Sequence, residues 1–586
     1  MSTKPSRTML TRTLERFHRV PADLRGLAIG AALLASHLVV SGRNGWFLRQ
    51  DFQFLGSRHA YLDRGDVGGF LFLPHDHGWS TIPILIHAAI VRISGLDSYL
   101  LPIVVLIAVD LVLILLLRLV LRRLGIRPWL ASGAALLFLA FGKGSDALAF
   151  AFTVDLVLGS ALVLGLFLLA DHDGPTDRRD WWCAGLAVLG LMVSVLGIVG
   201  FVVIGVWTVA RGRRRAAAVI AGPAAITLLF WFFTYGHRSI PVPSSQSIQG
   251  VAVSRQRPSV LSFVTDGLWN AGGSFLPWHV ASAICAALVA VAIVWCLRVR
   301  PMHGGRALVL ASVSGLFFVI IARMQVTDGD PSADRGKFVF VGALFLAPIV
   351  VLAVQHAGDV IASIISERFA KVAVCLVWVA SLAGNFVVLD ASRNHTQYEM
   401  SLARSNLAGL AGHPNFDVPG LLGDDEVLDP LLTADLTVGG LRRLVTRGLV
   451  HPSAELSTVE RLEVESRFFV KVESSGMLDQ PLSIDSFLYG QFEPAGPGCV
   501  TARVDRTKAP YLWARMKPTG ITFETVQVRS STHHLQFVLE GDGVISADRD
   551  LTSKSGEFPL RVVAGGLQLV LHLDDGSVVC GVRGLT

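Results

Sequence analysis

The sequence predicts a polytopic α-helical membrane domain over residues 1–390, followed by an extracytoplasmic β-rich domain over 391–586. Three observations support this division. The chain is 52% hydrophobic and only 16% charged, whereas soluble domains average about 25% charged residues. Nearly all of the long apolar runs lie before residue 390. The remaining residues have an ordinary soluble composition and are numerous enough to bury a core of their own.

About eleven segments are apolar over much of the length that a membrane-spanning helix needs, about 20 residues. These segments are 24–42, 100–120, 128–142, 153–170, 181–195, 197–210, 216–235, 279–298, 306–323, 338–356 and 372–390. The region 181–210 allows either a tight hairpin or one long tilted helix. Lysine and arginine concentrate before the first span and in alternate loops, which places the N-terminus in the cytoplasm and the C-terminal domain outside. We expect a multi-pass protein of a bacterial plasma membrane.

Two predicted outside loops are long, 43–98 and 236–278. Each contains an amphipathic stretch, at 81–94 and at 259–278, of the kind that lies in the plane of the membrane interface. Two interpretations stay open for these stretches. They pack the loops against the membrane domain, or they line a lateral opening for a lipid substrate.

The C-terminal domain begins with a predicted helix at 436–449 and continues as short alternating runs between turn residues, such as 499–505 and 533–541. This pattern is typical of a β-sandwich of jelly-roll type. Cys499 and Cys580 are the two cysteines of this domain. In an oxidising compartment they are candidates for one disulfide.

Some classes of function are disfavoured. The net charge is +6 and the pI about 9.1, but the basic residues lie in short loops between spans, so nucleic acid is not an expected partner. The sequence contains no Walker motif, GxGxxG fingerprint, GxSxG elbow or HExxH. Their absence argues against an ATP-driven pump, a dinucleotide enzyme, a serine hydrolase and a zinc protease.

Asp51 follows the first span, where the boundary between lipid and water is expected. A carboxylate there is costly unless it has a partner or a task. It would take a proton from a hydroxyl or bind a divalent cation such as Mg²⁺ or Mn²⁺. The alternative is an ion pair with Arg49 or Arg58.

The segment PHDHGW (74–79) is the second candidate. In an extended chain His75 and His77 would share one side, with Asp76 opposite. The histidines could supply part of a metal site, with Asp51, although no further ligand is apparent. The other interpretations are sugar binding, with Trp79 stacked on a sugar face, and ordinary loop structure.

Arg335 and Lys337 precede the tenth span, and two cations at the outer interface suit a lipid phosphate. The alternative is that both side chains reach from the apolar span to water. Asp110 and Asp155 lie inside spans, where a carboxylate is a functional candidate by default. Asp110 would otherwise pair with Arg118 or another helix, and Asp155 would reach water.

DFQFL, PHDHGWSTIPILIHAAI and ADRGKFVFVGALFLAP resemble motifs of an actinobacterial membrane-protein family and, more broadly, of the GT-C glycosyltransferases, which use polyprenyl-phosphate sugars. The resemblance covers most of 1–390. The family pattern has an acidic pair before an aromatic residue, PHNEHWSTLP and SRYxY. This chain departs from the pattern in having Gln50–Asp51, PHDHGW and Gly336–Lys337.

The resemblance implies an inverting glycosyltransferase with Asp51 as general base on an acceptor hydroxyl. Arg335 and Lys337 would hold the donor phosphate, and Arg49 would lie at the substrate site. The residues of the second motif would line the sugar pocket: His75, Asp76, His77 and Trp79. The donor would be a polyprenyl-phosphate sugar in the membrane, and the acceptor an envelope glycan bound by the C-terminal domain, or a lipid. The rival functions are a lipid or solute transporter, with Asp110 and Asp155 as a relay, and a non-catalytic scaffold of envelope assembly.

Overall fold

The computed structural model describes the helical part of the chain almost completely and the C-terminal part in separate stretches. The described residues are 20–48, 51–75, 78–238, 259–276, 278–299, 301–328, 335–413, 416, 424, 428, 436–453, 464, 470–472, 482–488, 490–496, 499–505, 512–517, 523–530, 534–541, 544–545, 549–552, 557–563, 568–580 and 582–583. They form two compact units. The first contains the described residues of Met1–Gly45, Asp66–Ile240 and Gln256–Tyr398, and the second those of Trp46–Gly65 and Glu399–Thr586.

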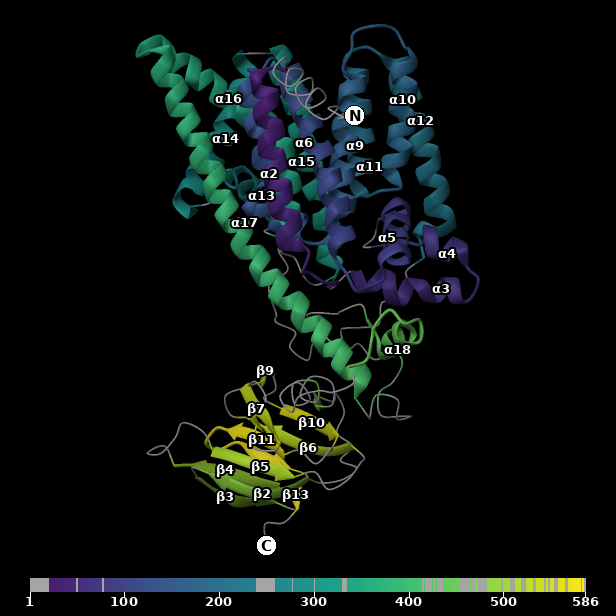
Figure 1. Cartoon of the computed structure of the whole chain (residues 1–586), viewed down its shortest axis with the longest axis vertical. Helices are drawn as coiled ribbons and strands as arrows, with labels where there is room; N and C mark the ends of the chain where they lie inside the picture. Colours follow the sequence, from purple (N-terminus) through teal and green to yellow (C-terminus); the bar gives the residue numbers. More distant parts are fainter. Residues whose placement is uncertain are drawn as a thin grey trace, which may run out of the picture. The chain divides into compact units, whose positions relative to one another are not determined.

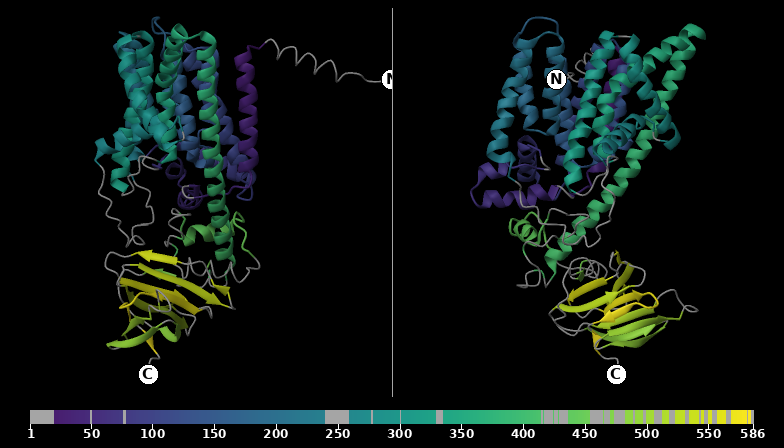
Figure 2. Two further views of the ribbon diagram at one scale, coloured as in Figure 1. Left: turned by 90° about the vertical axis from the view of Figure 1, so that its left-hand side faces the viewer. Right: turned by 180° about the vertical axis from the view of Figure 1, so that it is seen from behind.

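The first unit is a bundle of helices (Figures 1 and 2). Each of the eleven predicted spans corresponds to a helix: α2 (Ala22–Gly42), α6 (Leu100–Arg123), α7 (Pro128–Leu139), α9 (Val154–Ala170), α10 (Arg178–Leu191), α11 (Val195–Ala210), α12 (Arg214–Trp231), α14 (His279–Val299), α15 (Pro301–Asp328), α16 (Gly336–Ile364) and α17 (Glu367–Gly412). Among the described residues, seven helices are long and apolar enough to cross a membrane. The unit is that of a multi-pass membrane protein, and the count of eleven crossings stays a prediction.

Several helix ends differ from the expected spans, and two of them have a clear cause in the sequence. Helix α7 stops at Leu139 instead of 142, and Gly142 begins the 3₁₀ turn η2 (Gly142–Gly144). A Cβ atom on Gly142 would lie 2.3 Å from the backbone oxygen of Asn385, so only glycine fits against α17 here. Helix α17 continues far beyond residue 390, since no proline interrupts it before Pro414.

The region 181–210 forms a helical hairpin, which decides between the two alternatives left by its sequence. Helices α10 and α11 are separated by residues 192–194. They approach closely at two glycines, because a Cβ atom on Gly197 would lie 2.1 Å from the carbonyl carbon of Gly190. The hairpin therefore depends on the absence of a side chain at this crossing.

Both amphipathic stretches of the outside loops are helical: α5 (Thr81–Ser94) and α13 (Val260–Gly273). Residues 239–258 of the second loop lie outside the described part of the chain. Helix α13 packs closely on α15 and α16, where a Cβ atom on Gly267 or Gly342 would come within 2.4 or 2.7 Å of the Phe318 side chain. This packing supports the structural interpretation of α13.

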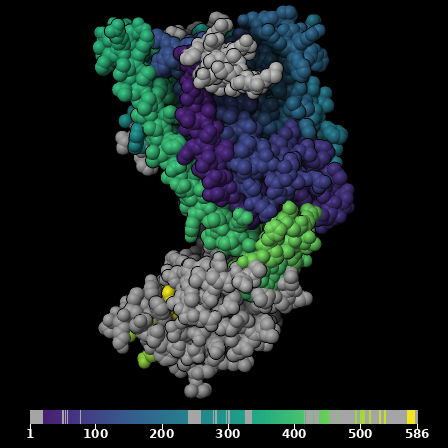
Figure 3. Space-filling model, viewed as in Figure 1, coloured from purple at the N-terminus to yellow at the C-terminus, as the bar shows by residue number. Residues whose placement is uncertain are grey.

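Helices α2 and α17 lie side by side on the face drawn in Figure 3. Three polar contacts join them, one of which is the hydrogen bond that the Gln397 amide donates to the carbonyl oxygen of Ser41. Arg393 Nη2 donates to the carbonyl oxygen of Leu38 at 2.7 Å, and His37 Nε2 lies 3.2 Å from Asp390 Oδ1. The long helix α17 is thereby attached to α2 near the middle of its length.

The second unit contains the start of the first outside loop, helix α18 and two antiparallel-rich sheets. Helix α18 (Val438–Thr446) packs on the π-helical turn η1 (Gln53–Arg58), which continues into α3 (His59–Asp63). Arg447, just after α18, forms an ion pair with Asp63 at the end of α3. The predicted helix at 436–449 is therefore present, with shorter bounds.

The sheets consist of short strands: β1 (Val470–Val472), β2 (Leu482–Leu488), β3 (Gly490–Gly496), β4 (Cys499–Val504), β5 (Leu512–Lys517), β6 (Phe523–Arg529), β7 (His534–Gly541), β8 (Val544–Ile545), β9 (Arg549–Thr552), β10 (Glu557–Val563), β11 (Gln568–Leu573), β12 (Val578–Cys580) and β13 (Val582–Arg583). One sheet has the order β1-β10-β6-β12-β4-β3. The other has the order β13-β2-β5-β11-β7-β8, with β9 also on β7. The jelly-roll assignment stays a prediction.

Cys499 and Cys580 are joined by a disulfide between neighbouring strands. The two residues are directly opposite each other in the register of β4 and β12, with 4.0 Å between their Cα atoms. The bond closes a segment of 81 residues that contains most of both sheets.

Candidate functional site

The predicted outer end of the helical unit carries a cluster of cationic, imidazole and aromatic side chains around Phe152. Lys337 Nζ lies 5.8 Å from the centre of the Phe152 ring and 5.4 Å from that of Phe338. The other neighbours of Phe152 are His75, at 4.9 Å between ring centres, and His87, at 6.4 Å. Residues that are distant in the sequence, His75 and Lys337, therefore meet on one aromatic side chain.

Lys337 is in the first turn of α16, the helix whose N-cap residue is Arg335. The N–H groups of a first helical turn have no acceptors within the helix, and the helix dipole adds partial positive charge there. The ammonium group of Lys337 lies over two ring faces, which stabilises it as a cation. The start of α16 thus places the ammonium group of Lys337, one of the two predicted phosphate ligands, near the positive end of a helix dipole.

The loop between α7 and α9 reaches the same helix start. A Cβ atom on Gly336 would lie 3.0 Å from Asp146 Oδ2 and 3.2 Å from the backbone oxygen of Lys143. Glycine at this position therefore allows the loop to contact α16. Lys143 was not predicted as a site residue, although a lone lysine in the apolar stretch 128–145 was an available signal.

Asn385 on α17 holds this loop through both ends of its amide. Its Oδ1 accepts a hydrogen bond from the Gly142 N–H at 3.1 Å. Its Nδ2 donates to the carbonyl oxygen of Phe275 at 3.3 Å, after α13. Asn385 is completely buried, so it links three separate segments near Lys143 at a place where unpaired polar groups are costly.

His75 lies in a tight turn. The His75 N–H donates to the Gly78 carbonyl oxygen, and the His75 carbonyl oxygen accepts from the Gly78 N–H, both at 2.8 Å. Arg49, Asp76 and His77 lie outside the described residues, so their predicted roles stay predictions. The imidazole of His87 is completely buried, which lowers its pKa to about 4 and keeps it neutral at pH 7.

Trp79 uses one ring face for internal packing. Its ring is stacked on Trp231 with 5.3 Å between centres and 3° between planes. Its Nε1 donates to Thr81 Oγ1 at 2.6 Å, and only 8% of the residue is exposed. A sugar could reach this ring only after the surrounding side chains move.

Asp51 belongs to the second unit and is 1% exposed. Its Oδ2 accepts from the Leu48 N–H at 3.0 Å, and Oδ1 has no hydrogen-bond partner among the described residues. Burial raises the pKa of this carboxyl to about 7, against the lowering effect of the Leu48 hydrogen bond. Within the described residues it forms no ion pair with Arg58, so that alternative is not observed.

The two carboxylates predicted inside spans differ. Asp110 is completely buried, and neither oxygen has a hydrogen-bond partner in the described part of the chain. Arg118, its suggested partner, instead pairs with Asp23. Asp155 Oδ1 accepts from the Leu156 N–H at 2.7 Å, in the first turn of α9.

A group of metal-type ligands exists elsewhere, at His172, Asp177 and Asp180. An arginine already occupies it, because Arg213 Nη2 lies 2.9 Å from both His172 Nε2 and Asp180 Oδ2. A divalent cation would therefore have to displace a guanidinium. Asp51 and His75 belong to different units.

No family model and no curated protein matches the chain. Among solved structures, it is similar to ArnT from Cupriavidus metallidurans in the apo state, with a TM-score of 0.46, 14% identity, and coverage of 74% of this chain and 90% of that one. For the ArnT structure bound to undecaprenyl phosphate, the TM-score is 0.44 and the identity 13%, with coverage of 72% of this chain and 89% of that one. For the mycobacterial arabinofuranosyltransferase AftD, the TM-score is 0.38 and the identity 11%, with coverage of 95% of this chain and 58% of that one.

Proposed function

We propose that this protein transfers a sugar from a polyprenyl-phosphate donor to an envelope glycan or lipid acceptor at the outer face of the plasma membrane. The observation that carries the proposal is the meeting of Lys337 and His75 on Phe152, beside the start of α16. Two motifs that suggested this enzyme class separately in the sequence are neighbours in the helical unit. A transporter or a scaffold gives no reason for that juxtaposition.

The phosphate of the donor would be bound by Lys337 and Arg335 at the N-terminus of α16, where the helix dipole adds partial positive charge. Charge-assisted hydrogen bonds from such groups are stronger than neutral ones. They would stabilise the negative charge that grows on the phosphate as the bond between the sugar and the phosphate oxygen breaks. His75 would line the sugar site, and Trp79 would contact the sugar once the side chains that cover its ring have moved.

Asp51 would act as the general base. The acceptor hydroxyl would attack the anomeric carbon, the sugar–phosphate bond would break, and the hydroxyl proton would pass to Asp51, so that polyprenyl phosphate leaves. One displacement of this kind inverts the anomeric configuration. A pKa of about 7 suits a base that must hold and release a proton near neutral pH. The β-rich domain would bind the acceptor glycan.

The decisive experiment is transfer of radiolabelled sugar from a polyprenyl-phosphate donor in proteoliposomes that contain the full chain. We expect transfer to fall at least about 100-fold in Asp51→Asn, because general-base catalysis contributes about 10²–10⁴-fold. Correct insertion is checked by protease accessibility, and thermal stability by inactivation of detergent-solubilised protein. Full transfer by correctly folded Asp51→Asn protein would remove Asp51 from the mechanism.

Asp110 supports a second candidate function, transport of a lipid or solute. Its carboxyl group is completely buried in α6 without a hydrogen-bond partner among the described residues. Ionisable groups inside spans often mark ion or substrate pathways. Counterflow of a labelled lipid that is abolished in Asp110→Asn, with no sugar transfer by wild-type protein, would favour this candidate.

A further inference from the structure

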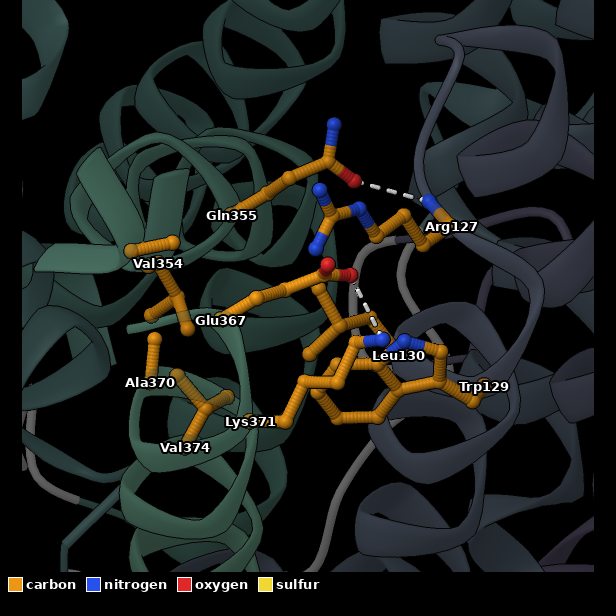
Figure 4. A pocket seen from close by; sticks show the side chains of 11 residues that line it. Arg127, Trp129, Leu130, Val354, Gln355, Glu367, Ala370, Lys371 and Val374 are labelled. Atoms are coloured by element: carbon orange, nitrogen blue, oxygen red, sulfur yellow. Dashed lines mark hydrogen bonds and ion pairs between the residues drawn. The ribbon is translucent and has the colours of Figure 1, made fainter. Parts of the chain in front are cut away.

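A hollow lies between α7, α16 and α17, at the end of α16 remote from Lys337 (Figure 4). It encloses about 270 Å³, including the part open to the surroundings. Its wall contains the apolar side chains of Leu130, Val354, Ala370 and Val374. Gln355 closes one end, because its Oε1 accepts from the Arg127 N–H at 2.7 Å and so ties α16 to the start of α7.

The surroundings of the hollow are apolar and exposed. Ile364 and Ile365, where α16 ends, are 75% and 64% exposed, and Phe369 and Val372, where α17 begins, are 55% and 56% exposed. In a multi-pass protein such a surface faces lipid. The predicted spans end close by, so the hollow lies at the level of the lipid headgroups on the predicted cytoplasmic side. An acyl chain that lies along the open side of the hollow would cover its apolar wall.

The rim carries two cations and two anions in alternation. Arg127 Nη2 lies 2.8 Å from Asp359 Oδ1, and Lys371 Nζ lies 2.6 Å from Glu367 Oε1. Figure 4 shows the charged ends of Arg127, Glu367 and Lys371 pointing toward one another. The hydrogen bond from Lys371, its charge and that of Arg127 lower the pKa of Glu367, so this carboxyl is ionised at neutral pH.

We propose that this hollow binds one phospholipid with a zwitterionic headgroup, a phosphate joined to a primary ammonium. The phosphate would share the N–H donors of Arg127 and Lys371, and the ammonium would lie at Glu367 or Asp359. One acyl chain would cover the apolar wall. A headgroup with a phosphate but no ammonium would satisfy the cations and leave the two carboxylates without a new partner. This binding site is separate from the proposed transfer reaction and does not depend on it.

The test uses the full chain in nanodiscs that contain photoactivatable phosphatidylethanolamine or phosphatidylglycerol, with the labelled peptides identified by mass spectrometry. We expect the ethanolamine lipid to label peptides from 127–130 and 354–374 up to about fivefold more than the glycerol lipid. An ion pair at the interface contributes at most about 1 kcal/mol, which corresponds to this ratio. Ala362→Leu, which fills the hollow, should reduce this labelling. Ala380→Leu makes the same change on an exposed part of α17 and should not.

The headgroup assignment has its own variant. Glu367→Gln removes a charge from a side chain that is 67% exposed, so folding should be preserved, and the ratio between the two lipids should fall toward one. Excess glycerophosphoethanolamine should not compete, because it lacks the acyl chain. Equal labelling by both lipids in wild-type protein, labelling unaffected by Ala362→Leu, or displacement by the soluble headgroup would each overturn the proposal.

Discussion

The ammonium group of Lys337 lies over the ring of Phe152, with 5.8 Å between Nζ and the ring centre. Phe152 follows the loop that carries Lys143, and the same ring contacts His75 from the first outside loop. A single aromatic side chain thus contacts residues of two candidate motifs, Lys337 at the start of α16 and His75 of the segment 74–79. The position of the lysine is set by packing and by attraction between the cation and the ring, which is worth about 0.5–2 kcal/mol.

Removing the charge of Lys337 should weaken binding of the lipid donor. For Lys337→Ala we expect the KM for the polyprenyl-phosphate donor to rise about 10-fold or more, as loss of a charge-assisted hydrogen bond costs about 1.5–3 kcal/mol. Lys337→Arg should recover part of the loss. Lys371→Ala is the matched control, since it removes a lysine at the other end of the helical unit. An unchanged KM in Lys337→Ala would contradict phosphate binding by this residue.

Asp51 predicts the pH dependence of transfer. The proposed base must be ionised, and burial raises its pKa to about 7. The rate of transfer under kcat/KM conditions should therefore fall about tenfold per pH unit below pH 7 and level off above it. The measurement is a pH–rate profile from pH 5 to 9. A flat profile across this range would be incompatible with Asp51 as the titrating base.

The same carboxyl predicts the pH dependence of stability. Its folded pKa, about 7, is above the ordinary value of 3.8, so between these values the folded state binds the proton and the unfolded state does not. This group therefore makes stability decrease as pH rises from about 4 to 7, with no further effect above. Asp51→Asn should remove this part of the slope in thermal inactivation measured from pH 4.5 to 8. An identical slope in the variant would argue that Asp51 is solvated.

Asn385 should act as a positioning residue for the loop that contains Lys143. Asn385→Leu leaves the buried Gly142 N–H without this partner, at a cost of about 1–3 kcal/mol, whereas the Phe275 carbonyl still accepts from the Ser381 hydroxyl. We expect lower thermal stability together with a higher KM for the lipid donor. Asn394→Ala, on an exposed position of the same helix, is the control. A purely structural role would lower stability and leave the KM of the folded fraction unchanged.

The crossing of α10 and α11 should tolerate no side chain at Gly197. Gly197→Val places a Cβ atom 2.1 Å from Gly190 before any movement, so we expect the hairpin to open and the yield of folded protein to collapse. Gly185→Ala is the control, because nothing lies within 4 Å of the added Cβ atom. Size-exclusion profiles in detergent report the outcome. Wild-type behaviour of Gly197→Val would mean that the helices cross differently.

The disulfide should stabilise the β-rich domain. Closing 81 residues restricts the unfolded chain by an entropy worth at most about 4–5 kcal/mol. The double variant Cys499→Ala/Cys580→Ala should therefore be cleaved within the domain by protease faster than wild-type protein. Adding reductant should reproduce the effect in wild-type protein and leave the variant unchanged. Equal cleavage rates would show that the strands hold the domain without the bond.

Local pattern was sufficient for most elements of the helical unit. Apolar runs such as 100–120 and 338–356 determine helices because every backbone polar group in lipid must be satisfied within the segment. Amphipathic spacing at 81–94 was similarly sufficient, and α5 has those bounds. Several strands were missed, including β2 and β5, because LSIDSFL and LWARMK lack the regular alternation that marked the others.

The sequence by itself therefore determined that this is a membrane protein, where its helices lie, and which residues are candidates for function, among them Asp51, His75 and Lys337. Only the tertiary structure decided which of these meet. Lys337 and His75 share Phe152, Trp79 stacks on Trp231, and Arg118 pairs with Asp23 and not with Asp110. Hydrophobic periodicity specifies which face of a helix is buried, whereas the partner of that face depends on helix packing across hundreds of residues. No local pattern contains that information.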